Sequence, residues 1–97
     1  MRTERINQAL SVLLGHEQGT EEYQVASYAI SAAMGGAHRE VLAQLVQDGP
    51  VCDGDVITKG ARDDLITWGL AVRICVKGKE GYTGANCRGL AVFQAAA

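Results

Sequence analysis

The 97-residue sequence has no apolar run that approaches the roughly 20 residues needed to span a bilayer. Its first residues, Met1 to Arg5, carry charge and lead into an amphipathic segment instead of the apolar centre of a signal peptide. The single proline and the hydrophobic fraction of 47% are ordinary for a folded domain. We therefore expect one cytoplasmic domain with no membrane association.

Cysteine and histidine are scarce. The three cysteines, Cys52, Cys75 and Cys87, are odd in number and widely spaced, which suits reduced thiols better than a disulfide framework. No two cysteines have the short spacing of a zinc site, and His16 and His38 each lie alone in helical stretches. We expect no metal and no cofactor.

Motifs that indicate an enzyme are also missing. The sequence has no glycine-rich phosphate loop, no histidine pair spaced for a metal and no serine in a nucleophile elbow. Asp53 and Asp55 flank Gly54 like a fragment of a calcium loop, but the rest of that motif is absent. A cysteine nucleophile brought near a histidine by the fold is the enzymatic route left open. The expectation is a protein that is not an enzyme.

Charge is unevenly distributed along the chain, although the net charge is only −2. Residues 1–54 carry three basic and seven acidic side chains, whereas residues 55–97 carry six basic and four acidic ones. The second half is therefore the part better suited to approach a polyanion. The overall acidity argues against strong nonspecific affinity for DNA.

Apolar spacing predicts two helices in the first 36 residues. The first is capped by Thr3 and ends at Gly15, and the second is capped by Thr20 and runs to about Met34. The second helix is rich in alanine and serine, whose small side chains allow close helix approach. These residues serve either packing within the chain or a homodimer through the N-terminal helices, and the sequence leaves both open.

In the second half of the chain, the spacing of the apolar residues changes from that of a helix to that of a strand. A helix from about Ala37 to Gln47 is followed by turn-like residues 50–57 and by a short helix, capped by Thr58, that ends before Gly69. Apolar residues then alternate from position 70 to 76, which predicts a half-buried strand. The inward positions are expected to be Leu70, Val72, Ile74 and Val76.

A hairpin and a helix complete the predicted order. Residues 77–81 form a glycine-containing turn, and Tyr82 to Ala85 return as the second strand. Asn86 is suited to cap a last helix that extends through Phe93.

Residues 40–93 resemble a winged helix-turn-helix, and in particular the winged half of MarR-type regulators. Residues 40–50 (EVLAQLVQDGP) are similar to the helix that opens the DNA-binding lobe. Residues 65–73 (LITWGLAVR) resemble the exit of the recognition helix, and residues 85–89 (ANCRG) take the place of the Leu-Thr-x-x-Gly that caps the following helix.

The fold that this resemblance implies is mainly α with a small β-hairpin. A winged helix-turn-helix (residues 37–97) follows two N-terminal helices (residues 1–36) in a single domain, residues 1–97. The family has a full helix before the recognition helix, whereas residues 51–57 leave room for at most one turn. Residues 1–36 resemble no family that we can name, but compact helical heads of this kind suit small phage or prophage proteins.

The resemblance implies a transcriptional regulator that binds double-stranded DNA. Side chains near the start of a recognition helix reach base edges, while the wing meets phosphates or the minor groove. Arg62 is the expected base contact, because a guanidinium can bind guanine at two positions. The expected DNA-binding residues are Thr58, Lys59 and Arg62 on the helix and Arg73, Lys77 and Lys79 on the wing.

A second function stays open, namely a protein-interaction module such as a phage accessory or assembly factor, because a fold does not fix a function. The shortened helix-turn-helix and the acidic first half favour this hypothesis. An exposed Trp68 near the end of the recognition helix would also favour it, but core packing suits that residue equally well. Lys77 and Lys79 can also serve only to hydrate an exposed turn.

Overall fold

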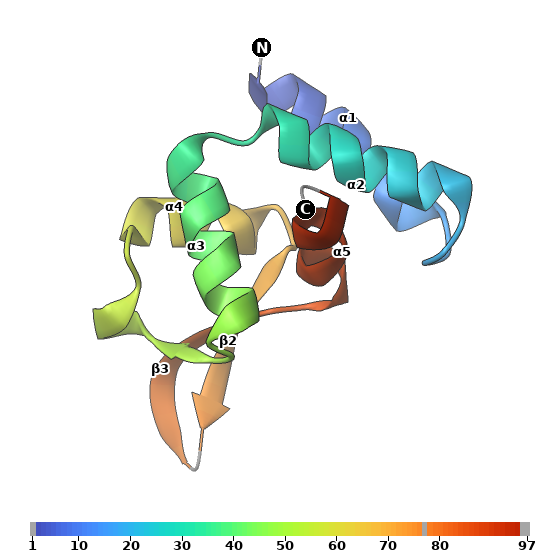
Figure 1. Ribbon diagram of the computed structural model, residues 1–97. Coiled ribbons are helices and arrows are strands. Elements are labelled where there is room, and N and C mark those ends of the chain that lie inside the picture. The colour runs from blue at the N-terminus through green and yellow to red at the C-terminus, as the bar shows by residue number, and fades with distance from the viewer. Residues whose placement is uncertain (1, 77, 96–97) are drawn as a thin grey trace.

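The computed structural model describes residues 2–76 and 78–95, and for residues 2, 3, 76, 79 and 80 the backbone only (Figure 1). Over this part the chain is mainly helical with one small antiparallel sheet, which confirms the predicted class. None of the described helices is long and apolar enough to cross a membrane. In order, the elements are α1 (Arg2–Gly15), α2 (Glu21–Ala33), α3 (Gly36–Gln47), β1 (Val51–Cys52), the 3-10 helix η1 (Asp53–Asp55), α4 (Lys59–Thr67), β2 (Ala71–Val76), β3 (Lys79–Ala85) and α5 (Cys87–Ala95).

The first two helices form an antiparallel pair at one end of the molecule (Figure 1). α2 begins as predicted, because the backbone N–H of Tyr23 donates to the hydroxyl of Thr20 at 3.3 Å. The predicted cap at Thr3 is wrong, since α1 begins one residue earlier and contains Thr3. Ile6 and Leu13 are buried on the side of α1 that packs on α2, as helical spacing requires.

The core lies between α2, α3, α4 and α5. α2 rests on α5, and α3 packs against both α4 and α5. Arg39 in α3 donates two hydrogen bonds, at 3.3 and 2.9 Å, to the carbonyl of Ser31 near the end of α2, which fixes these two helices relative to each other. The fully buried side chains between these four helices include Ile30, Val41, Leu45, Leu65, Leu70 and Val92.

The sheet has three strands, with β3 between β1 and β2 and antiparallel to both. The sequence predicts only the β2–β3 hairpin and does not indicate β1. β1 is defined by the pairing of Val51 with Thr83, and two residues are too few for an alternating pattern to appear. The single helical turn expected within residues 51–57 is present as η1.

The predicted inward face of β2 is wrong at the start of the strand, and the side chain of Val76, also predicted to face inward, lies outside the described residues. Ala71 is 2% exposed, whereas Val72 is 42% exposed. Leu70 belongs to the end of α4 and precedes the strand. An alternation counted from Leu70 therefore assigns Ala71 and Val72 to the wrong faces of β2. Val72 and Ile74 therefore face away from α4, and Ile74 lines a shallow apolar hollow with Pro50.

Gly69 ends α4 as predicted, with a φ of +76° that favours glycine. Its N–H donates to the carbonyl of Ile66 at 3.0 Å, and the N–H of Leu70 donates to the carbonyl of Leu65 at 2.9 Å. These two bonds form a Schellman motif, and the buried side chains of Leu65 and Leu70 supply its apolar contact. Leu70 thus packs the hairpin onto the helical core, as expected.

Asn86 caps α5, also as predicted. Its Oδ1 accepts from the N–H of Gly89 at 2.9 Å, and its Nδ2 donates to the carbonyl of Gly69 at 2.7 Å. One side chain therefore starts α5 and holds that helix against the end of α4. A Cβ at Gly89 would lie 2.1 Å from the carbonyl oxygen of Leu70, so this approach requires glycine.

We expect Gly89→Ala to lower the free energy of unfolding by about 2–3 kcal/mol, because the new methyl group must displace backbone in a packed region. The matched control is Gly60→Ala in α4, where a Cβ meets no atom within 4 Å. Alanine there should raise stability by up to about 1 kcal/mol. Urea unfolding followed by circular dichroism measures both, and equal stability of the two variants would contradict the assigned contact.

Candidate functional site

The residues expected to bind DNA begin at the start of α4. Thr58 has the extended backbone of an N-cap, with φ −136° and ψ 110°, but its side chain makes no capping hydrogen bond among the described residues. Thr58 therefore occupies the predicted N-cap position of α4, but the capping hydrogen bond expected from its side chain is not formed. Lys59 is exposed on the first turn of α4, where it can meet a ligand.

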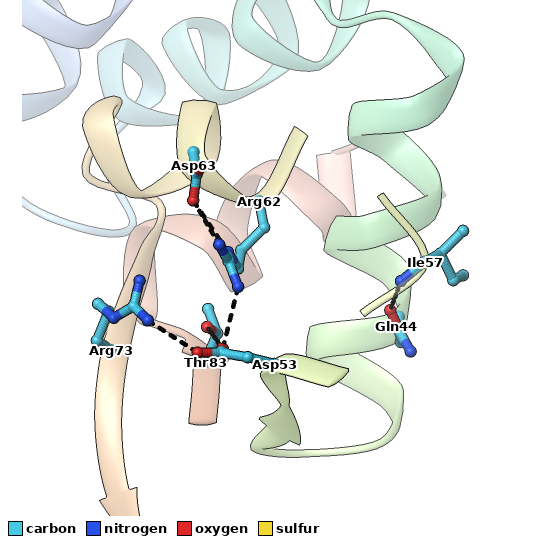
Figure 2. Close-up of polar contacts among 7 residues, drawn as sticks. All are labelled: Gln44, Asp53, Ile57, Arg62, Asp63, Arg73 and Thr83. Carbon is cyan, nitrogen blue, oxygen red and sulfur yellow. Dashed lines mark hydrogen bonds and ion pairs between the residues drawn. The ribbon is translucent and has the colours of Figure 1, made fainter. Parts of the chain in front are cut away.

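The Asp53 carboxylate organises the region beside α4 (Figure 2). Its Oδ1 accepts a hydrogen bond from the hydroxyl of Thr83 at 2.9 Å and pairs with Nη1 of Arg62 at 3.2 Å. Its Oδ2 accepts from Nη2 of Arg73 at 2.8 Å. One carboxylate in η1 therefore connects α4, β2 and β3, and we call it and these three partners the Asp53 cluster.

Arg62 lies on the inner side of α4 and is only 8% exposed. Besides its pair with Asp53, its Nε and Nη2 donate to Oδ1 of Asp63 at 3.0 and 2.8 Å. The guanidinium proposed to read a base is thus directed at two carboxylates within its own chain. A contact with guanine would require those pairs to break.

Arg73 reaches Asp53 from β2, and its side chain remains 58% exposed. It is the member of the Asp53 cluster that is open to a ligand without rearrangement. Lys77 lies outside the described residues, as does the side chain of Lys79, whose backbone begins β3.

The outer face of α4 is acidic. Asp63 and Asp64 are exposed there, with Lys59 as the cation at the start of the helix. Asp64 also pairs with Nε2 of His38 in α3 at 2.8 Å. The ring of His38 lies 4.8 Å from that of Trp68, which is half-buried against the core and so is not the exposed aromatic side chain that the protein-binding hypothesis favours.

Gln44 connects α3 to the segment that precedes α4. Its Nε2 donates to the carbonyl of Asp55 at 2.7 Å, and its Oε1 accepts from the N–H of Ile57 at 3.1 Å (Figure 2). The segment after η1 is therefore held on α3 by one amide side chain, which is how α4 keeps its position without a full preceding helix.

A second surface lies on the α1–α2 pair, far from the β2–β3 hairpin (Figure 1). A groove of about 470 Å³ runs between the two helices, and among its residues Val12 and Val25 are 42% and 62% exposed. We call this the α1–α2 groove. It is lined by Arg5, Gln8, Ala9 and Val12 from α1 and by Val25, Ala26, Ala29, Ala32 and Ala33 from α2.

Cysteine and the other metal-ligating side chains are dispersed in the described part of the chain. No group of three or more histidine, cysteine or acidic side chains is placed to hold a metal in that part of the chain. Cys52, Cys75 and Cys87 are unpaired and exposed.

Compared with protein-family models, curated proteins and solved structures, the chain finds no match. The function must therefore be argued from the chain's own contacts.

We expect Asp53→Ala to lower the free energy of unfolding by about 2–4 kcal/mol, because Arg62 loses a buried partner and the buried Thr83 hydroxyl loses its acceptor. Asp55→Ala is the control, since it removes an exposed carboxylate from the same turn and should change stability by less than about 0.5 kcal/mol. Chemical unfolding measures both values. A loss no larger than the control's would show that the cluster does not hold α4 to the sheet.

Proposed function

We propose that residues 36–95 form a variant of the winged helix and that the chain acts as a protein-interaction module. The order of elements supports the fold: an opening helix (α3), a short strand, a helix (α4), a two-stranded hairpin and a closing helix. The helix that normally precedes the recognition helix is reduced to η1.

The functional proposal rests on the charge of the exposed side of α4. A helix that enters a DNA groove presents cations or amides to the phosphates and bases. The exposed side of α4 instead presents Asp63 and Asp64, and the one arginine of the helix is buried against carboxylates. Because like charges repel at close range, this face is poorly suited to duplex DNA.

Exposed apolar side chains support a protein partner. Of the seven large hydrophobic side chains that are exposed among the described residues, four belong to the α1–α2 pair, namely Val12, Leu14, Val25 and Tyr28. Exposed apolar side chains that gather on one part of a surface mark interaction sites. Val12 and Val25 line the α1–α2 groove, which is therefore the proposed binding surface.

DNA binding as a transcriptional regulator is the second candidate. It is favoured by the resemblance to the winged helix and by Lys59, which is exposed at the start of α4. In that case Lys59, Arg73, Lys77 and Lys79 would contact phosphates, and Arg62 would first have to leave the Asp53 cluster.

Titration of the protein into a fluorescent random duplex separates these candidates. At about 50 mM salt, where phosphate contacts are strong, we expect no saturable rise in anisotropy. Salt-sensitive binding would contradict the proposal, above all if Lys59→Gln weakens it and Arg2→Gln does not. Arg2 is the control because it begins α1, at the end of the molecule away from the hairpin (Figure 1).

A quantitative pull-down from lysate of the source cell tests the surface itself. We expect a protein retained by the wild-type chain to be lost with Val25→Glu, because a carboxylate would be buried in an apolar contact. It should still be retained with Lys59→Glu. Loss with Lys59→Glu alone would move the binding site to α4.

A further inference from the structure

The α1–α2 groove has two unlike ends. At one end the exposed side chains are branched, Val12 from α1 and Val25 from α2. At the other end α2 presents only methyl groups, those of Ala32 and Ala33, while Ala29 lies midway. The side chains of α2 in the groove are therefore larger at the valine end than at the alanine end.

Charge is distributed in the same unequal way. Arg5 lines the end with the alanines. Glu22 is exposed in the first turn of α2, three residues before Val25 and on the same helical stripe, so it extends the end with the valines. Glu21 lies four residues before Val25, so it adds a second carboxylate at the same end.

We infer that the α1–α2 groove binds the same groove of a second copy of this chain. A two-fold axis perpendicular to the helices near Ala29 would bring opposite ends together. α2 would then pack on the partner's α2 in the opposite direction, with Val25 over Ala33, and Arg5 would lie at the same end of the interface as the partner's Glu22. One symmetry operation therefore satisfies both shape and charge, which is the condition for an isologous dimer.

The floor of alanines fits this arrangement. Helices approach within about 8 Å when the side chains between them are small, and the groove extends along α2 for about 12 Å from Val25 to Ala33. Two antiparallel pairs joined in this way make a four-helix interface. The inference rests on the proposed protein-binding function and names its partner.

The oligomeric state is the first test. Sedimentation equilibrium of the wild-type chain should give a dimer whose dissociation constant rises at least about tenfold in Val25→Glu. Tyr28→Glu is the matched control, because Tyr28 is 64% exposed on the same helix but lies outside the groove. A wild-type chain that stays monomeric at about 0.1 mM, or equal weakening by both variants, would overturn the inference.

A charge exchange tests the contact between copies. Arg5→Glu and Glu22→Arg should each weaken the homodimer about tenfold, since each places like charges together at two symmetric positions. Mixing these two variants should restore affinity to within about threefold of the wild type, because opposite charges then face each other at both positions of the heterodimer. Glu40→Arg makes the same charge change at an exposed position on α3, outside the groove, and should leave the wild-type dimer unchanged.

If the mixture stays as weak as the separate variants, the two-fold arrangement is wrong. That failure differs from failure of the proposed function. A monomeric chain whose retained partner is lost with Val25→Glu keeps the protein-binding surface and excludes a second copy as its occupant. A dimer insensitive to Val25→Glu excludes the groove for self-association.

Discussion

The position of α4 depends on the Asp53 carboxylate. The segment before α4 is short, and the inner side of α4 is held to the sheet by ionic and polar contacts in addition to its packing on α3. Arg62, Arg73 and Thr83 converge on Asp53 from three elements that are distant in sequence, and Arg62 and Thr83 are buried there. Breaking such a cluster leaves a buried charge or hydroxyl without a partner, which costs more than the pair adds when intact.

The same contacts determine what α4 can recognise. A guanidinium that neutralises carboxylates within its own chain contributes little positive potential to the surface, and the carboxylates that remain exposed on α4 make its outer face acidic. The cluster therefore stabilises α4, and it occupies the guanidinium of Arg62, for which the sequence predicts a base contact. Structural support and the expected base contact would require the same arginine.

Much of the fold could be predicted because the signals are local. Gly69 and Asn86 act through their own backbone conformation and through caps within a few residues, so the sequence indicates the end of α4 and the start of α5. β1 and the Asp53 cluster could not be predicted, because they depend on pairing across about thirty residues. Arg62 shows why the site could not be fully predicted. Its guanidinium near the start of a predicted helix suggests a DNA contact, whereas its actual partners become known only when η1 and α4 are placed together.

The two ends of the molecule differ in the polarity of their surfaces. The hairpin end carries paired charges, whereas the α1–α2 end carries exposed valines beside alanines. α1 packs mainly on α2, so its outer side has no cover among the described residues. Exposure of apolar surface to water is unfavourable by about 25 cal/mol per Å². In the proposed dimer the valine end of each groove covers the alanine end of the other, so both grooves are removed from water together. Such a dimer would leave both hairpins free at its outer ends.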